Sequence, residues 1–202
     1  MRYTGPKVKK ARRLGTIFTA KDAKILQKRN FPPGQHGQNR QRLSEYGLQL
    51  REKQKAKFSY GILERQFENY FNKALKQQGV TGDNLLKLLE MRLDNVVFRL
   101  GFAQTRAQAR QLVSHGFFEI NEKRVDIPSY SLKVGDVVVV RQNKRKSKYI
   151  EQAQEKIKSF QTQEWLQLDA GKLSGKILTA PTPEITGNTI NTQLIVEHYS
   201  RT

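Results

Sequence analysis

The residues with the clearest chemistry in this sequence are the Lys and Arg side chains of its N-terminal part. Residues 1–60 hold sixteen of them against three Asp or Glu residues, so +13 of the formal net charge of +19 lies in this stretch. Such a field repels itself unless a polyanion neutralises it. Nucleic acid is the usual polyanion, because Lys and Arg displace the counterions of its phosphates. The charge distribution therefore predicts a nucleic-acid partner.

Two basic groups within this stretch are candidates for phosphate contacts. The first group lies at 7–13 and consists of Lys7, Lys9, Lys10, Arg12 and Arg13. The second group lies on a charged run at 45–57 and consists of Arg51, Lys53, Lys55 and Lys57. A solvated helix face is the simpler interpretation of the second group, but like charges four residues apart repel one another on such a face. We therefore favour a surface that faces phosphates.

A third basic group lies in residues 91–141. Its members are Arg92, Arg99, Arg106, Arg110, His115, Lys123 and Arg124. Arg106 and Arg110 are four residues apart, so we expect them to share one face of a helix, opposite its apolar face. The guanidinium fork matches phosphate geometry, which suits a surface that contacts a nucleic-acid backbone. The alternative is a set of surface arginines paired with Glu119, Glu122 or Asp126.

Short helices are the elements that must position the first two groups. Residues 1–45 are predicted to be irregular with short helical pieces, and 32–37 to be a turn, because that segment combines prolines and glycines. Ser44 is a candidate cap for a helix over about 45–57. Apolar residues at spacings of three and four predict further helices at 61–78 and 83–90. We interpret the aromatic residues of the 61–78 helix as core rather than as base-stacking groups.

The third group belongs to a predicted compact unit over 91–141. Its first helix carries an apolar face and stops at Gly101; that face consists of Leu93, Val96, Val97 and Leu100. A second helix is expected after Thr105, a capping residue, and should bury Ala109, Leu112 and Val113. Short strands are predicted at 117–120, 124–127 and 137–140. This order predicts a small α+β unit. Residues 144–160 are expected to be helical, and 194–196 to form a strand or a docking segment.

Length and composition bound the class of protein. A chain of 202 residues suggests one or two domains, and a hydrophobic content of 37% suffices for modest cores. The chain has no Cys, which excludes disulfides and Cys-based zinc sites. No apolar run has the length of a membrane helix, and the N-terminus lacks the apolar core of a secretory signal. We expect a soluble intracellular protein; an anionic membrane surface is the weaker alternative, because 1–15 lack a bulky apolar face.

Several motifs in the compact unit resemble the S4-type RNA-binding domain. They are Met91-Arg-Leu-Asp-Asn-Val-Val-Phe-Arg-Leu-Gly101, Thr105-Arg-Ala-Gln-Ala-Arg-Gln-Leu-Val-Ser-His115, Val125-Asp-Ile-Pro-Ser-Tyr130 and Val134-Gly-Asp-Val137. The flanking motifs are similar to the bacterial-type family of small-subunit ribosomal protein S-four. They are Pro33-Gly-Gln-His-Gly37, Ser44-Glu-Tyr-Gly47, Leu50-Arg-Glu-Lys-Gln-Lys55, Tyr60-Gly-Ile-Leu-Glu-Arg-Gln-Phe67, Asp169-Ala-Gly-Lys172, Leu194-Ile-Val-Glu197 and Tyr199-Ser-Arg201. The resemblance covers essentially the whole chain, in order.

The resemblance implies an α+β protein with a helical N-terminal domain and an inserted S4-type domain. The implied boundaries are 1–89 for the basic rRNA-binding domain, 90–154 for the S4-type domain and 155–202 for a C-terminal segment that packs back on the first two. The implied function is structural: early binding of small-subunit, 16S-type rRNA, which nucleates assembly of the subunit body. Other implied partners are mRNA, ribosomal protein S-five and further small-subunit proteins. The location would be the ribosome of a bacterial cytoplasm or, alternatively, of a plastid.

The resemblance also assigns roles to single residues. Gln35 and His36 join the three basic groups as rRNA-binding residues, and Arg40 and Arg42 would line the channel by which mRNA enters. Glu197 and Tyr199 would belong to the interface with ribosomal protein S-five, which is linked to decoding accuracy. We expect no catalytic residue, no metal and no cofactor.

Two rival functions are an RNA enzyme and a free RNA-binding regulator. RNA-modifying enzymes and tRNA synthetases share the S4-type domain, but this chain has no phosphate-binding glycine loop and no Cys nucleophile. A free RNA-binding regulator would not need the motifs of 33–67 or the C-terminal tail.

Asp94 and Asp136 are expected to pair with Arg or cap turns rather than to catalyse. The family's Asn-Gly-Lys hairpin is Asn121-Glu-Lys123 here, which calls for a positive φ at Glu122.

Overall fold

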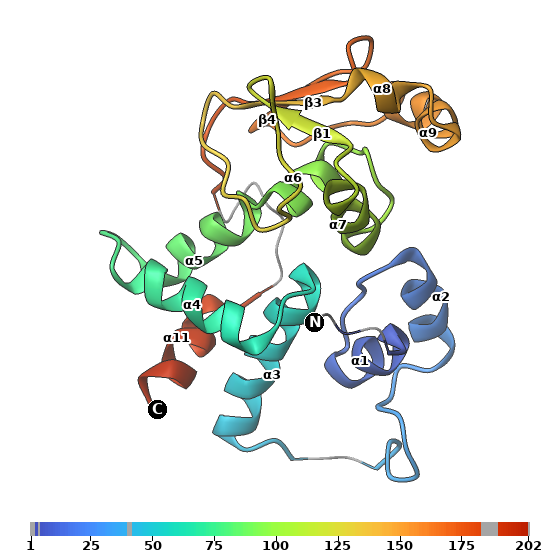
Figure 1. Cartoon of the computed structure of the whole chain (residues 1–202). Helices are drawn as coiled ribbons and strands as arrows, with labels where there is room; N and C mark the ends of the chain where they lie inside the picture. Colours follow the sequence, from blue (N-terminus) through green and yellow to red (C-terminus); the bar gives the residue numbers. More distant parts are fainter. Residues whose placement is uncertain (1–2, 4, 40–41, 183–189, 202) are drawn as a thin grey trace. The chain divides into compact units, whose positions relative to one another are not determined.

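The computed structural model describes residues 3, 5–39, 42–182 and 190–201 (Figure 1). The chain divides into two compact units. Unit 1 comprises Met1–Gly82 and Thr189–Thr202, and unit 2 comprises Asp83–Asn188. No helix within the described ranges is long and apolar enough to cross a membrane.

Unit 1 is helical. Its helices are α1 (Lys7–Leu14), α2 (Ala20–Lys28), α3 (Glu45–Tyr60), α4 (Glu64–Leu75) and α11 (Thr192–Ser200). Ser44 accepts a hydrogen bond from the Gly47 amide, as predicted for the cap of α3, and Thr19 with Asp22 forms a capping box at α2. Gly61 takes a left-handed conformation, φ 63°, and ends α3.

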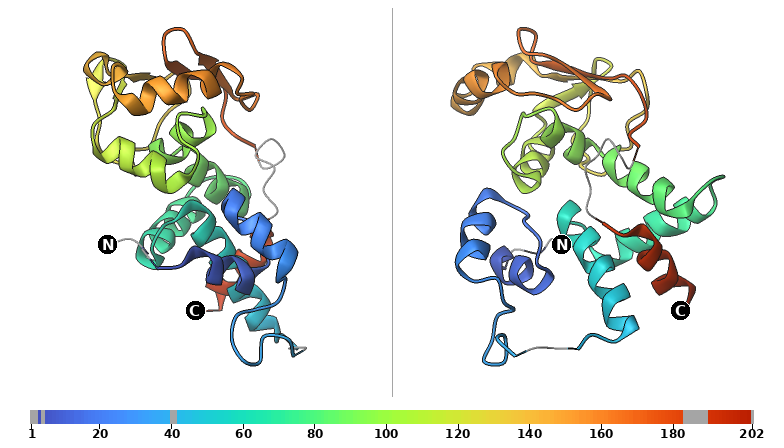
Figure 2. Two further views of the ribbon diagram at one scale, coloured as in Figure 1. Left: turned by 90° about the vertical axis from the view of Figure 1, so that its right-hand side faces the viewer. Right: turned by 180° about the vertical axis from the view of Figure 1, so that it is seen from behind.

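The C-terminal helix α11 packs against α3 within unit 1 (Figures 1 and 2). The sequence predicted a strand or a docking segment at 194–196, and the segment is helical. The Asn191 side chain accepts hydrogen bonds from the amides of Gln193 and Leu194, which starts the helix, and Ile195 is fully buried. The tail therefore returns to the first unit as a helix, not as a strand.

Unit 2 combines helices with one antiparallel sheet. Its elements are α5 (Thr81–Glu90), which leads in from unit 1, α6 (Leu93–Arg99), α7 (Arg106–Ser114), β1 (Phe118–Ile120), β2 (Lys123–Arg124), β3 (Val137–Val140), α8 (Gln142–Arg145), α9 (Lys148–Lys158), β4 (Leu166–Asp169) and β5 (Ser174–Ile177). The strand order is β2-β1-β3-β5-β4, and each neighbouring pair is antiparallel. Helices α6 and α7 lie against one face of the sheet (Figure 1). The fold is therefore α+β, as expected.

The predicted apolar faces form the core of unit 2. Leu93, Val96, Val97 and Leu100 are fully buried, and so are Ala109 and Val113 of α7. The sole Trp of the chain, Trp165, joins the same core. The helix periodicity therefore identified the core correctly.

The second predicted strand is shorter than expected. Strand β2 comprises Lys123–Arg124, and the Val125 amide adds one bond to the Phe118 carbonyl of β1, whereas the prediction was 124–127. The following segment bonds to the start of α6 instead: the Leu93 amide donates to the Tyr130 carbonyl and the Asp94 amide to the Pro128 carbonyl. Pro128 has no amide hydrogen with which to continue a ladder. The chain therefore leaves the sheet.

The turn between β1 and β2 keeps the two-residue geometry. Asn121 has φ 47° and Glu122 has φ 68°, so both adopt the left-handed conformation that such a turn requires. The Asn121 side chain donates to Asp136 Oδ1 at 2.8 Å and accepts from the Val137 amide at 3.1 Å. These two bonds hold Asn121 in this left-handed conformation.

Candidate RNA-binding surfaces

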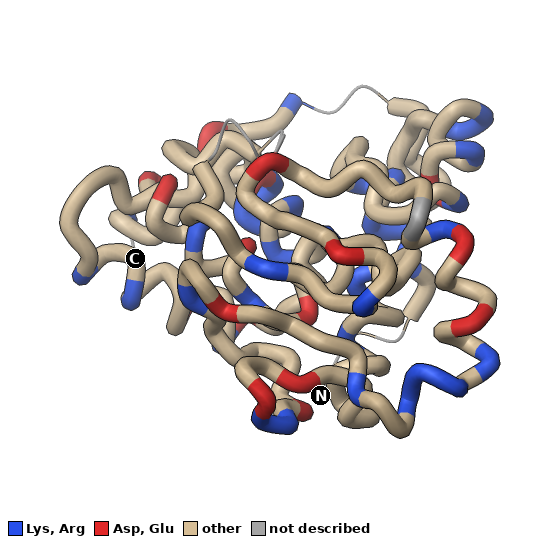
Figure 3. The backbone as a smooth tube through the Cα atoms, turned by 90° about the horizontal axis from the view of Figure 1, so that it is seen from above, with Lys and Arg blue, Asp and Glu red and all other residues tan. Residues whose placement is uncertain are grey.

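Helix α1 presents the first basic group. Ala11 and Leu14 are the buried residues of this helix, and none of its Lys or Arg side chains is buried. Lys7, Lys9 and Arg13 are exposed, and Lys10 and Arg12 are half-buried. Figure 3 marks the Lys and Arg positions of the described residues in blue. The full sequence has 37 Lys and Arg residues against 18 Asp and Glu residues.

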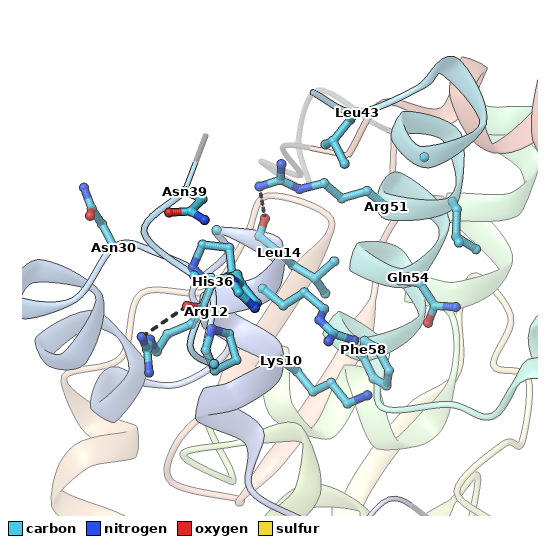
Figure 4. A pocket seen from close by; sticks show the side chains of 18 of the residues that line it. Lys10, Arg12, Leu14, Asn30, His36, Asn39, Leu43, Arg51, Gln54 and Phe58 are labelled. Atoms are coloured by element: carbon cyan, nitrogen blue, oxygen red, sulfur yellow. Dashed lines mark hydrogen bonds between the residues drawn. The ribbon is translucent and has the colours of Figure 1, made fainter. Parts of the chain in front are cut away.

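Two arginines of unit 1 bond to uncharged partners. Arg12 donates through Nε to the Phe31 carbonyl at 3.1 Å, and its guanidinium lies 5.0 Å from the Phe31 ring centre. Arg51 of α3 donates to the Leu14 carbonyl at 3.1 Å, as Figure 4 shows. Neither arginine forms an ion pair with a described residue. Their charges are therefore held in place without being neutralised.

The lysines of α3 are in a different situation. Lys53 and Lys57 each lie 2.7 Å from a carboxylate oxygen of Glu64, and Lys55 lies 3.4 Å from Glu52. Burial by itself raises the pKa of Glu64, but hydrogen bonds and charge attraction from Lys53 and Lys57 outweigh it and lower that pKa to about 2. The repulsion expected along α3 is thus relieved inside the unit. Carboxylates stand beside these lysines, and their role as phosphate contacts stays a prediction.

Four arginines of the third group belong to a polar network in unit 2. Arg92 and Asp94 form an ion pair of 2.8 Å with both side chains buried, and Arg110 also donates to Asp94. Asp94 therefore has the structural pairing expected of it. The prediction that the α7 arginines lie opposite its apolar face was wrong, because Arg110 turns toward α6 alongside the buried Val113.

The same network continues to the end of α5. Arg99 donates to the buried Glu90 at 2.8 Å, and Arg106 donates to Asn95 Oδ1 at 2.7 Å. Asn95 in turn donates to Glu90. The acidic partners in this network are thus Asp94 and Glu90; of the partners in the alternative interpretation, Asp126 pairs with Arg124 and Glu119 pairs with Arg141.

The remaining members of the third group are exposed. His115 follows α7, and Lys123 and Arg124 form β2 at the edge of the sheet. The Arg124 guanidinium lies 3.4 Å from Asp126, with both side chains more than half exposed, so this pair binds weakly. These three residues are available to a ligand.

The residues assigned through the family resemblance divide between surface and interior. Gln35 and His36 are exposed on the loop after α2, and Arg42 is exposed, while Arg40 lies outside the described residues. On α11, Glu197 accepts a hydrogen bond from Gln49, and Tyr199 donates to Glu64 at 3.2 Å. Burial, and then the nearby Glu64 charge, raise the pKa of Tyr199. Both α11 side chains thus serve contacts inside unit 1.

A cavity of about 950 Å³ opens between α1, α3 and the loop that follows α2. We call it the α1–α3 cavity (Figure 4). Its lining includes Gln35 and His36 from the loop, with Arg12 and Arg51 on the helices, so unit 1 brings together members of both N-terminal groups. Phe58, Leu50 and Gln54 also line it and were not among the predicted site residues. The signal for Phe58 was present, because an aromatic residue directly follows a basic run.

Family models match the chain in two adjacent parts. A model of the ribosomal protein S4/S9 N-terminal domain matches residues 2–90, and a model of the S4 domain matches residues 91–138. Together with the α+β fold, these matches place the chain in a class of structural RNA-binding proteins rather than enzymes.

Relatives narrow this class. The chain is 53% identical over 204 residues to the small ribosomal subunit protein uS4 of Chloroflexus aurantiacus, 48% identical to that of Acetivibrio thermocellus and 49% identical to that of Chlorobium limicola. Each alignment covers 99% of this chain and 99% of the relative. The chain therefore belongs to the uS4 family of small ribosomal subunit proteins.

Proposed function

We propose that this chain is a structural component of the small ribosomal subunit, where it binds rRNA early and helps to nucleate assembly of the subunit body. The observation that carries this proposal is the basic surface of unit 1. Its Lys10, Arg12, Arg13 and Arg51 side chains form no ion pair with a described carboxylate, so phosphates are left to neutralise them. The family membership supports the small subunit as the place.

Unit 2 supplies a second contact with RNA, in which a network of ion pairs supports a few exposed basic residues. His115, Lys123 and Arg124 are exposed at the end of α7 and at β2, and they present charge to the RNA backbone. The network of Asp94 and Glu90 with their arginines holds α6 and α7 in the arrangement from which these residues project. Arg92, Arg99, Arg106 and Arg110 would then act on RNA mainly by shaping this surface.

The finer roles concern mRNA and translational accuracy. The exposed Arg42, with Arg40, would line the channel by which mRNA enters. Helix α11 would help to form the interface with ribosomal protein S-five, where Glu197 and Tyr199 fix the helix on unit 1. The bacterial relatives support ribosomes of a bacterial cytoplasm as the location; plastid ribosomes remain the alternative.

Salt dependence tests the RNA-binding proposal directly. If the full chain neutralises roughly six to ten phosphates of a small-subunit rRNA fragment, log K should fall with log salt at a slope of about −5 to −9. Filter binding at a series of KCl concentrations between 50 and 300 mM measures this slope, because salt screens the charge interactions progressively over this range. Lys10→Gln with Arg13→Gln should reduce the slope by about 2. A slope near zero in the unmodified chain would contradict the proposal.

A further inference from the structure

The charged side chains that line the α1–α3 cavity are all basic. Five of its side chains are Lys or Arg, from Lys10, Arg12, Arg13, Arg51 and Lys57, and none is Asp or Glu. A concave site lined by one sign of charge concentrates the potential and attracts counter-ions. The cavity is therefore suited to an anion.

The cations of this cavity are positioned but mostly not neutralised. Arg12 and Arg51 donate to backbone carbonyls, and Lys10 Nζ lies 4.7 Å from the Phe58 ring centre. Of the five, only Lys57 reaches a described carboxylate, that of Glu64. A guanidinium has five N–H donors, so Arg51 keeps donors for a ligand after its bond to Leu14. Unit 2 shows the opposite pattern, because Arg92, Arg99 and Arg110 form ion pairs with Asp94 and Glu90.

The cavity also has apolar walls, which a simple anion would not need. Leu14, Leu50 and Phe58 contribute them from the two helices, and Pro32 and Pro33 from the loop. Figure 4 shows the Lys10 side chain extending beside Phe58, so a cation and an aromatic face lie together. Bases stack on aromatic side chains whatever their sequence, and nearby cations add to the attraction. Apolar and cationic surfaces side by side match a base and its phosphate.

The cavity has room for one nucleotide. Pockets for small molecules span roughly 300–1,000 Å³, so a cavity of about 950 Å³ holds a nucleotide. A paired base cannot enter, since its edges and faces are engaged in the helix. Unpaired bases of loops and bulges are the ones that proteins splay out and stack.

We propose that the α1–α3 cavity receives an unpaired nucleotide of the bound RNA. The base lies on the apolar wall at Phe58, and the phosphate meets Arg51 and Arg13. This proposal rests on the proposed function, because it takes RNA as the ligand of unit 1. It adds that unit 1 reads an unpaired nucleotide and not only duplex charge.

The test uses the full chain and two variants that separate stacking from charge. Phe58→Leu keeps an apolar side chain but removes the aromatic face, and Arg51→Gln removes one charge from the cavity. Arg65→Gln is the charge-matched control, because Arg65 is exposed on α4 and does not line the cavity. The probes are hexa-adenylate, a blunt RNA duplex of twelve base pairs and a small-subunit rRNA fragment. Thermal melts confirm that each variant is folded.

Stacking of one base predicts a clear pattern. Phe58→Leu should weaken the binding of hexa-adenylate and of the rRNA fragment roughly tenfold. Its affinity for the duplex should be unchanged. Arg51→Gln should reduce the affinity for hexa-adenylate more than Arg65→Gln does. Equal losses on single-stranded and duplex RNA, or no loss in either cavity variant, would overturn the cavity proposal while the proposed function stands. Failure of the unmodified chain to bind the rRNA fragment would instead overturn the proposed function.

Free nucleotides are the other source of the same chemistry. Adenosine monophosphate and inorganic phosphate serve as competitors against hexa-adenylate. Competition by adenosine monophosphate only at concentrations far above those of hexa-adenylate supports the RNA nucleotide. If adenosine monophosphate binds as tightly as hexa-adenylate, the occupant is a free nucleotide, and the assignment to RNA is wrong.

Discussion

An arginine in this chain takes its role from the group that its guanidinium meets. Arg51 donates to a carbonyl and keeps its charge for a ligand, whereas Arg92 is buried against Asp94. Nothing in the spacing of basic residues separates the two cases. The acidic residues that matter lie on neighbouring elements: Asp94 on α6 serves Arg110 on α7, and Glu64 on α4 serves Lys53 on α3. Tertiary packing therefore decides which basic residues remain available.

Removing the α7 arginines should cost stability as well as RNA affinity. Arg106→Ala with Arg110→Ala takes away donors from Asn95 and from the buried Asp94 carboxylate. Loss of one partner from a buried ion pair costs about 3–5 kcal/mol, and Arg92 stays to moderate the loss, so we expect about 2–4 kcal/mol. Urea unfolding followed by Trp165 fluorescence measures it. Lys123→Ala with Arg124→Ala is the exposed control, and equal stability in both double variants would contradict the network.

Glu64 should make unit 1 sensitive to acid. Its folded-state pKa of about 2 lies below the ordinary value of 4.5, so its ion pairs stabilise the fold above about pH 4.5 and lose that contribution as pH falls toward 2. Because the Glu64 side chain is 44% exposed, we expect only about 1 kcal/mol. Unfolding free energies of the unmodified chain and Glu64→Gln should differ at pH 7 and converge near pH 2. A difference independent of pH would contradict this assignment.

At the scale of elements, α11 is attached to unit 1 by an aromatic stack, by burial of apolar groups and by side-chain hydrogen bonds. The Tyr199 ring stacks on Phe71 with centres 4.4 Å apart, and its hydroxyl donates to Glu64. Gln49 on α3 donates to Glu197, and Ile195 is fully buried beside it along the helix. The helix is thus held by stacking and burial, with polar contacts at its rim.

Tyr199→Ala should therefore release α11. Truncation of a packed aromatic side chain costs about 3–5 kcal/mol, while Tyr199→Phe keeps the stack and should cost about 1 kcal/mol for the lost hydrogen bond. Hydrogen exchange of the α11 amides measures the release. A stop-codon readthrough reporter should show more misreading for Tyr199→Ala than for Tyr199→Phe, with rRNA affinity nearly unchanged. Normal accuracy together with impaired rRNA binding would contradict this division of roles.

Helices with an apolar period were predictable from sequence, and so were the short apolar strands β1 and β3, whereas β4, β5 and α11 were not. Helix α6 was predicted from the spacing of Leu93, Val96, Val97 and Leu100. The start of α3 was predicted from the capping residue Ser44. Strands β4 and β5 lack the run of apolar residues that indicated β3: Leu166 and Leu168 are the apolar residues of β4, and β5 includes Gly175, where an added Cβ would collide with the Leu100 side chain. The place of β5 in the sheet requires that close approach. The helix at 192–200 was missed because Leu194, Ile195 and Val196 are consecutive and show no period.

At the scale of the whole molecule, charge and core are divided between the two units. Unit 1 contains the segment that carries +13, and unit 2 contains a contiguous core that includes α6, α7, the strands and Trp165. The composition was enough to predict a nucleic-acid partner, and the motifs were enough to indicate the family and RNA. The α1–α3 cavity was not predictable, since its walls come from three segments that only the fold of unit 1 brings together.

This division predicts the effect of a core substitution in unit 2. Leu93 is fully buried, and Leu93→Ala should destabilise unit 2 by about 2–5 kcal/mol. Trp165, the only Trp, reports on that unit, so its fluorescence transition in urea should move to lower concentration. The cations of unit 1 do not depend on this core. The salt slope of rRNA binding should therefore keep most of its magnitude, even where affinity falls through loss of the contacts at β2. A variant with an unchanged Trp165 transition and no rRNA binding would show that Leu93 faces RNA and not the core.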